Sequence, residues 1–234
     1  MTDRPEQKSV VVVGATKGLG LALTEEYLGH GWRVVATSLE PSAGLDKLAQ
    51  EFGTRLQVVE LDITSRADTV RLQAALEGQR IDVLHIVAGV FQRTTAPIWE
   101  QPAQEILRLL ETNSIGALRL AELLGPQVPQ GGVFAFTSSG MGSLWRNDRG
   151  DVDLYRVSKV ALNMLVRSFA ARHRESGRAT LLLCPGWAKT DMGGPDATVE
   201  VSDSARGMYQ LVATAQPNPA GAVFREYTGN EIPW

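Results

Sequence analysis

Short apolar runs alternate along the chain with segments in which apolar residues recur at helical spacing. The runs predict buried strands, and the periodic segments between them predict helices that each bury one face. The predicted strands are Val10–Val13, Arg33–Thr37, Leu56–Leu61, Ile81–Val87, Val133–Thr137, Thr180–Cys184 and Ala222–Tyr227. The predicted helices cover 19–28, 43–52, 65–76, 102–124, 154–173 and 201–213, with Ser65 as an N-cap.

Strands that alternate with helices predict an α/β fold with a mainly parallel, seven-stranded sheet covered by helices on both faces. Right-handed crossovers make this a doubly wound Rossmann fold. Because no linker, repeat or low-complexity tract divides the chain, we expect residues 1–234 to form a single domain. Ligands of such sheets bind outside the carboxyl ends of the strands. The loops expected at that edge are 14–20, 37–40, 62–63, 88–92, 138–150 and 185–195.

Composition and charge argue against several classes of function. A net charge of −3 gives no reason to expect nucleic acid. The single cysteine, Cys184, allows no intrachain disulfide and favours a reducing, cytoplasmic location. We expect neither a signal peptide nor a membrane span, because no apolar run is long enough. His30, His85 and His173 are far apart in sequence, so we expect no metal site.

A glycine-rich stretch, Gly14–Gly20, directly follows the first predicted strand and opens a helix. Glycines at such a turn let a pyrophosphate approach the amides of the helix N-terminus. The spacing is Gly-x-x-x-Gly-x-Gly. Glycine turns of this kind also serve packing alone, so the stretch by itself leaves both interpretations open.

A second motif, Tyr155-Arg156-Val157-Ser158-Lys159, falls in a predicted helix. Residues four apart share one helix face, where an ammonium can lower the pKa of a phenol and make it a usable acid. Such pairs also occur by chance on surface helices. The context strengthens the chemical interpretation, because Ser138-Ser139 and Pro185-Gly186 follow the strands on either side and Asn113 lies in the preceding long helix.

With these motifs the chain resembles the short-chain dehydrogenase/reductase family. The resemblance implies a catalytic tetrad of Asn113, Ser139, Tyr155 and Lys159. In it, Tyr155 gives a proton to the carbonyl oxygen, Ser139 hydrogen-bonds that oxygen, and Lys159 holds the nicotinamide ribose and stabilises the phenolate. Asn113 supports a water relay to Lys159. Ser139 is preferred to its neighbour because it begins a Ser-x-x-Gly pattern.

The resemblance also implies a nicotinamide cofactor. Asp62 matches an adenine-contacting acid, or is a turn former, and Thr190 matches a carboxamide contact, or is a helix cap. NADP(H) is preferred and NAD(H) remains possible, because no acid ends the second strand and Lys17 can pair with a 2′-phosphate. The expected cofactor-binding residues are Gly14, Thr16, Lys17, Gly18, Leu19, Gly20, Thr37, Ser38, Asp62, Ile63, Ala88, Gly89, Asn113, Tyr155, Lys159, Pro185, Gly186, Trp187 and Thr190.

A narrower resemblance, to the C-factor (C-signal) and sniffer-like carbonyl reductase branch, rests on three stretches: Tyr155–Asn163, Thr190–Pro195 and Gly229–Trp234. The chain departs from the expected pattern in two places. Leu39 stands where that branch often has Arg, and Ile86-Val87 replaces the Asn-Asn that usually precedes Ala-Gly, which bears on adenosine binding or stability.

Five apolar residues on the predicted loops suggest a pocket for an apolar or aromatic carbonyl compound, although such residues are more often core. They are Phe91, Met141, Trp145, Trp187 and Met192. The charged residues of 146–151 are interpreted as a solvated loop, with contact to an anionic substrate as the alternative.

The sequence thus predicts a carbonyl reductase or alcohol dehydrogenase. One alternative is a non-catalytic nucleotide-sensing or signalling protein, for which a complete tetrad has no use. The other is an epimerase or dehydratase with the same Tyr-Lys pair. We also expect a homodimer or homotetramer, although the branch includes monomers, because the helices at 102–124 and 154–173 carry surplus apolar residues. These are Ile106, Leu109, Leu110, Leu118, Leu162, Leu165, Val166 and Phe169.

Overall fold

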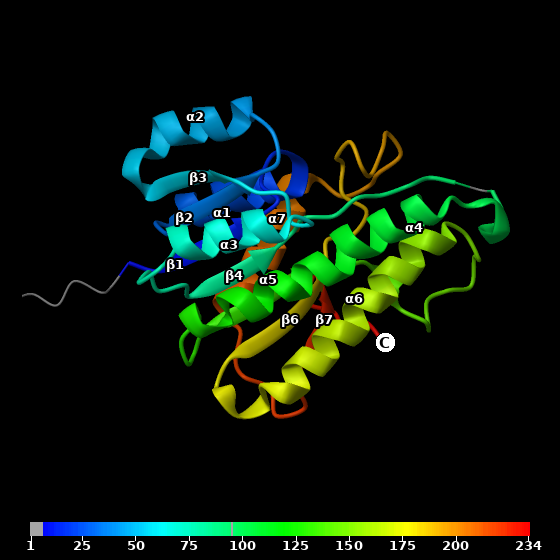
Figure 1. Ribbon diagram of the computed structural model, residues 1–234. Helices are drawn as coiled ribbons and strands as arrows, with labels where there is room; N and C mark the ends of the chain where they lie inside the picture. The colour runs from blue at the N-terminus through cyan, green and yellow to red at the C-terminus, as the bar shows by residue number, and fades with distance from the viewer. Residues whose placement is uncertain (1–6, 95) are drawn as a thin grey trace, which may run out of the picture.

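A computed structural model describes residues 7–94 and 96–234. Its centre is one seven-stranded sheet in the order β3-β2-β1-β4-β5-β6-β7, and every neighbouring pair of strands is parallel (Figure 1). The strand order reverses between β1 and β4, which creates a crevice at the carboxyl edge. The strands are β1 Ser9–Val13, β2 Arg33–Ser38, β3 Leu56–Glu60, β4 Val83–Ile86, β5 Val133–Thr137, β6 Ala179–Cys184 and β7 Val223–Glu226.

Helices cover both faces of this sheet, as Figure 1 shows. On one face the core is shared with α3, α5 and α6, and on the other with α1, α2 and α7. The helices are α1 Gly18–Gly29, α2 Ala43–Phe52, α3 Arg66–Ala75, α4 Ala103–Leu110, α5 Gly116–Leu124, α6 Asp153–Arg172 and α7 Val201–Ala213. Among the described residues, no helix is both long and apolar enough to cross a membrane.

The alternation of side chains along β1 explains why the sequence of this central strand reads as a continuous apolar run. Val11 and Val13 of β1 enter the core on the α5 and α6 side, while Val10 and Val12 enter the core on the α1 and α7 side. Because both faces are buried, both sets of positions are apolar. The predicted fold class is therefore confirmed, down to the number of strands.

One predicted helix is not continuous. The segment expected to run from 102 to 124 consists of α4 and α5, separated by a π-helical turn at Glu111–Ile115. Asn113 and Ser114, both buried, lie in this turn and face α6. The periodicity of apolar residues does not reveal the wider π-helical turn, because the apolar spacing remains helical on both sides of it. Such turns are frequent at functional sites.

A buried histidine lies in the middle of the sheet, away from the carboxyl edge. His85 of β4 is fully buried, and its Nδ1 shares a 3.2 Å hydrogen bond with the Tyr27 hydroxyl on α1. Among the described residues its Nε2 has no hydrogen-bond partner. Burial lowers the pKa of His85 to about 3, so the imidazole is neutral in the folded chain at neutral pH.

This histidine should make the fold sensitive to acid. Its pKa is depressed in the folded state, so its contribution is complete above the unfolded pKa of about 6.5 and is lost as the pH falls towards 3. We expect it to lower the free energy of unfolding by about 2 kcal/mol between pH 8 and pH 5, measured by urea unfolding. His85→Leu should remove that loss and the exposed-site variant His30→Gln should keep it; an unchanged loss in His85→Leu would contradict this role.

Candidate active site

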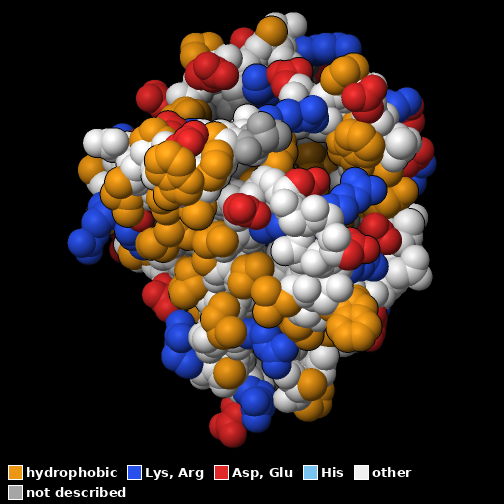
Figure 2. Space-filling view, turned by 90° about the vertical axis from the view of Figure 1, so that its right-hand side faces the viewer, with side chains coloured by type: hydrophobic (Ala, Val, Ile, Leu, Met, Phe, Trp, Pro, Cys, Tyr) orange, Lys and Arg blue, Asp and Glu red, His pale blue; other side chains and the backbone are white. Residues whose placement is uncertain are grey.

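A cleft of about 1730 Å³ lies over the carboxyl edge of the sheet and is lined by all of the loops that the sequence placed there. Figure 2 looks onto this side of the molecule and shows a hollow with an apolar floor between charged side chains. The volume exceeds the roughly 300–1,000 Å³ of an ordinary small-molecule pocket, so the cleft has room for a dinucleotide together with a second ligand.

The glycine stretch forms the turn between β1 and α1, and its glycines are required by space. Gly14 has φ +88°, and a Cβ there would lie 2.6 Å from the Cα of Ala88 on the next loop. A Cβ on Gly20 would lie 2.0 Å from the carbonyl oxygen of Gly14. No side chain caps the N-terminus of α1, whose first residues line the cleft. A helix N-terminus left open in this way suits an anionic group.

The end of β2 supports this turn from the side. The hydroxyl of Thr37 accepts a 3.1 Å hydrogen bond from the Gly14 amide, while Ser38 bonds to the Thr16 hydroxyl and to the Glu40 carbonyl. Ser38 therefore braces the glycine turn and does not line the cleft, contrary to its expected role as a cofactor contact. Its hydroxyl is held by partners that sequence spacing does not reveal.

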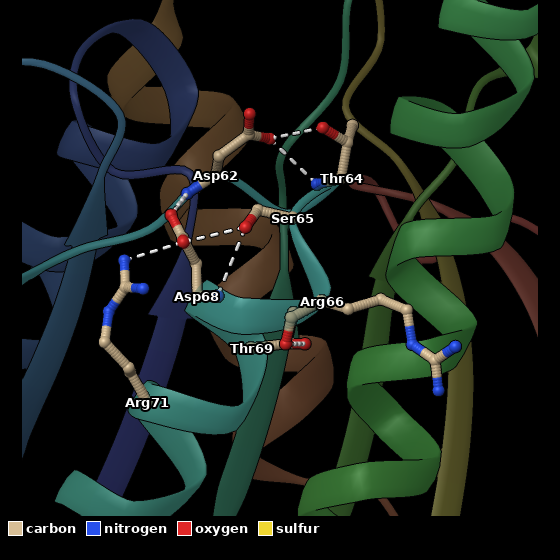
Figure 3. Close-up of polar contacts among 7 residues, drawn as sticks. All are labelled: Asp62, Thr64, Ser65, Arg66, Asp68, Thr69 and Arg71. Carbon is tan, nitrogen blue, oxygen red and sulfur yellow. Dashed lines mark hydrogen bonds and ion pairs between the residues drawn. The ribbon is translucent and has the colours of Figure 1, made fainter.

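Asp62 follows β3 and lines the cleft, and Figure 3 shows how it is held. Its Oδ1 accepts hydrogen bonds from the amide and the hydroxyl of Thr64, at 2.8 and 2.7 Å. Its amide in turn donates to Asp68, which also binds Ser65, the predicted N-cap of α3. Asp62 is thus a turn former, and these bonds also fix the carboxylate at the wall of the cleft.

Lys17 forms an ion pair that the sequence did not suggest. Its Nζ lies 2.9 Å from Asp191 on the loop after β6, and both side chains are largely exposed. Next to this pair, a Cβ on Gly18 would lie 3.2 Å from the methyl group of Thr190. The hydroxyl of Thr190 accepts from the Gly193 amide, which is a local turn bond. The loop after β6 therefore lies against the glycine turn.

Tyr155 and Ser139 come together in the cleft. Tyr155 lies in the first turn of α6 and Ser139 shortly after β5, and both line the cleft. A hydrogen bond between the Ser139 hydroxyl and the phenol acts to lower the pKa of Tyr155. The neighbouring Ser138 instead donates a 2.6 Å hydrogen bond to Asn163 and is buried. Phe91 packs edge-to-face on Tyr155 with ring centroids 4.7 Å apart, which limits where the phenol can lie.

Lys159 lies one turn further along α6, with its Nζ 5.8 Å from the centroid of the Tyr155 ring. The ammonium donates to the carbonyl oxygen of Thr137 at 3.1 Å. Asn113 bonds to both backbone groups of Val90 and to the Ser158 hydroxyl, so its side chain fastens the loop after β4 to α6. A Cβ on Gly89 would be 3.3 Å from Asn113 and 3.5 Å from Lys159.

Burial sets the protonation states of the two central groups. It raises the pKa of Tyr155 to about 12, although the hydrogen bond from Ser139 acts in the opposite direction. It lowers the pKa of Lys159 to about 8. The lowered phenol pKa expected from the Tyr-Lys spacing is therefore wrong for the chain by itself. At neutral pH the phenol carries its proton and the lysine is mostly charged.

Most of the predicted pocket residues do line the cleft. Phe91, Met141, Trp187 and Met192 contribute to its walls, but Trp145 does not and is 81% exposed. The Trp145 amide donates to the carbonyl oxygen of Trp234, so the loop turns towards the C-terminus there. Of the other predicted site residues, only Asn113 and Ser38 lie behind the walls; Asn113 is buried beneath the loop that it holds.

Sequence reasoning missed three charged groups at the cleft. Asp191 pairs with Lys17, Arg93 donates to the Gly193 carbonyl at 2.9 Å, and Arg156 is almost fully buried beside Tyr155. The first two tie the loop after β6 to the glycine turn and to the loop after β4. A signal for Arg156 was its place inside the Tyr-x-x-x-Lys motif, directly after the expected acid.

Comparison with known proteins agrees with this geometry. C-signal of Myxococcus xanthus is 41% identical over 156 residues, which cover 66% of this chain and 93% of that protein. A structure of a short-chain dehydrogenase/reductase from Burkholderia multivorans with bound NADP superposes with a TM-score of 0.94 at 36% identity, covering 98% of this chain and all of that one. The carbonyl reductase Sniffer of D. melanogaster gives 0.89 at 27% identity, with the same coverage.

These similarities confirm the resemblance to the C-factor and sniffer-like branch. The family model described as short chain dehydrogenase matches residues 8–200, which include the glycine turn, the end of β5 and the Tyr-x-x-x-Lys motif. With that match and the parallel sheet that carries these motifs at one edge, the chain belongs to the short-chain dehydrogenase/reductase family.

Proposed function

We propose that this oxidoreductase is an NADP(H)-dependent carbonyl reductase, which transfers a hydride between the cofactor and a carbonyl compound or its alcohol. The observation that carries the proposal is that Tyr155, Ser139 and Lys159 line one cleft, which also contains an uncapped helix N-terminus. The NADP bound to the Burkholderia protein and the activity named for Sniffer support the choice of cofactor and reaction.

The residues present fit a dinucleotide. The glycines of the first turn leave space where any Cβ would collide, and the N-terminal amides of α1 point a partial positive charge at that space. In the proposed complex these amides hold the pyrophosphate, Asp62 contacts the adenine and Thr190 the carboxamide. When bound, the cofactor supplies the hydride that the protein lacks.

The proton chemistry falls to three side chains. Reduction leaves negative charge on the carbonyl oxygen, so donors must point there before the hydride arrives. Tyr155, protonated at neutral pH, gives its proton to that oxygen, and Ser139 donates a hydrogen bond to it. Lys159 stabilises the resulting phenolate and binds the nicotinamide ribose. Asn113 keeps the loop at Gly89 and Val90 beside Lys159.

The apolar walls indicate the class of substrate. Phe91, Met141, Trp187 and Met192 line the cleft, and Phe91 packs on Tyr155, so the cleft suits an apolar or aromatic carbonyl compound. The alternative function is nucleotide binding without turnover, which the likeness to C-signal favours. A protein that only sensed nucleotide would not need a protonated phenol and a buried lysine at the same place.

Assembly into a dimer or larger oligomer stays a prediction. Four of the apolar residues named for it, Leu109, Leu162, Val166 and Phe169, are buried within the chain and so cannot form an interface. The same helices and the π-helical turn between α4 and α5 nevertheless expose other apolar side chains. These are Leu107, Ile115, Val157 and Met164. They lie on neighbouring elements, which is the arrangement that a self-complementary interface requires.

Replacing the phenol tests the mechanism. We expect Tyr155→Phe to lower kcat by at least about 100-fold, because the proton donor is lost while the ring remains. NADPH affinity, measured by fluorescence titration, should stay within about twofold, since the ring volume is unchanged. Tyr209→Phe, on α7, is the matched control and should keep normal turnover. Carbonyl reduction by Tyr155→Phe at the wild-type rate would rule out the proposed role.

Changing the exposed lysine of the glycine turn tests the preference for NADP(H). Lys17→Ala should weaken NADPH by about fivefold and NADH by less than about twofold, because an exposed ion pair to a phosphate is worth little more. Asp191→Asn frees the ammonium from its partner and should not weaken NADPH. Lys47→Ala, on the exposed side of α2, serves as control. Equal losses for both cofactors in isothermal titration would show that Lys17 does not select between them.

A further inference from the structure

The helix that carries Tyr155 begins in an unusual way. Its N-cap, Val152, has φ +48° and ψ +46°, and no side chain caps the first amides of α6. Among the described residues Val152 is the only one other than glycine with a positive φ. A β-branched residue is strained in this left-handed conformation, so the surrounding structure must hold it there.

A buried arginine provides that support. Arg156 is 7% exposed, and its Nε donates to the backbone carbonyl of Asp151 at 2.7 Å and to Oδ1 of the same residue at 3.2 Å. Its Nη2 donates to Oδ1 at 2.5 Å. These charge-assisted bonds lower the pKa of Asp151, so the carboxylate stays charged. The bond to the carbonyl fixes the peptide that enters Val152.

The Arg156–Asp151 contact therefore closes a short ring of the chain, residues 151–156, which contains both the strained Val152 and Tyr155. The chain itself also links this ring to Ser139, because residues 139–151 run from the serine to Asp151. The ring thus sets where the phenol lies relative to the serine that hydrogen-bonds to it. The backbone bond from the Arg156 amide to the Val152 carbonyl lies in the same turn.

We propose that Arg156 is a positioning residue: with Asp151 it holds Val152 in its left-handed conformation and so fixes the Tyr155 phenol against Ser139. The inference rests on the proposed function of Tyr155, but the device itself is independent of turnover. Arg156 would act through the turn and need not touch the substrate. An exposed capping residue could not fix the turn in this way, because the hydrogen bonds that hold the turn come from the buried, planar guanidinium of Arg156, whose donors have a fixed geometry.

Removing the guanidinium of Arg156 should lower kcat more than it changes the affinity for NADPH. We expect Arg156→Met to lower kcat for carbonyl reduction at least tenfold while the Kd for NADPH stays within twofold. In alcohol oxidation, which needs the phenolate, the rising limb of the pH profile should move to higher pH by about half a unit or more, because the phenol loses the Ser139 bond that lowers its pKa. Arg172→Met, on the same helix as Arg156, removes an exposed ion pair to Glu122 of α5; it is the matched control and should change neither quantity.

Relief of the strain provides the complementary test. Glycine adopts the left-handed conformation freely, so Val152→Gly should leave kcat within twofold and, combined with Arg156→Met, should restore kcat at least threefold. Asp151→Ala is the milder variant, should Arg156→Met fail to fold, and should shift kcat and the pH profile in the same direction. A purely structural arginine would lower stability without moving the pH profile and without rescue by glycine.

One readout does not depend on turnover. Hydrogen–deuterium exchange of the peptide covering residues 153–160 should be at least tenfold faster in Arg156→Met and unchanged in Arg172→Met. Unchanged exchange in Arg156→Met, or a kcat within twofold of wild type, would overturn the proposed positioning. Absence of carbonyl reduction by the wild-type protein would instead contradict the proposed function, while the exchange result would still decide whether the turn is held by Arg156.

Discussion

The structure depends on one close approach between two backbones. Gly14 ends β1 in a conformation with φ +88°, and the Cα of Ala88, which follows β4, lies 2.6 Å from the place where a Cβ would be. This contact stands at the point where the strand order reverses, and it lets the chain turn directly from β1 into α1. The helix N-terminus is thereby brought over the sheet edge, beside the ends of β4, β5 and β6. Any side chain at Gly14 would collide with Ala88, force the loop after β1 away from the loop after β4, and so disrupt the cleft.

Burial then decides what the cleft can do chemically. Tyr155 and Lys159 lie on the same side of α6, and both lose solvent where the helix meets the ends of β5 and β6. Because burial disfavours the charged form of each group, the phenol keeps its proton, while the lysine, with its pKa lowered to about 8, is still mostly charged at neutral pH. A protonated phenol is the state that can deliver a proton to a carbonyl oxygen as it becomes an alkoxide. A phenol is protonated at neutral pH in water as well, so the fold contributes the place of Tyr155 in the cleft, next to Lys159 and Ser139, and not a stronger acid.

The strands and the set of loops at the sheet edge could be predicted because strands buried on both faces are apolar throughout, as β1, β5 and β6 nearly are, while the edge strands β3 and β7 still carry apolar residues next to polar ones. The N-cap at Ser65 and the bounds of α2 and α7 followed from local signals of the same kind. The features that could not be predicted depend on contacts between residues far apart in the sequence, or leave no trace in the pattern of apolar and polar residues. Lys17 and Asp191 are far apart along the chain, and the π-helical turn around Asn113 keeps a helical apolar spacing. Arginines are mostly exposed, so apart from its place inside the Tyr-x-x-x-Lys motif nothing in the sequence indicated that Arg156 is buried.

The most direct measurement follows the hydride itself. The protein is incubated with NADPH carrying deuterium at C4 of the nicotinamide, in each stereochemical form, and with a panel of aromatic and aliphatic carbonyl compounds; the products are then analysed by mass spectrometry. We predict that one of the two forms gives an alcohol with a single deuterium on the carbinol carbon, in amounts equal to the NADPH consumed. Tight binding of NADPH without deuterium transfer to any member of the panel would contradict a reductase and favour a protein that binds the nucleotide without turnover.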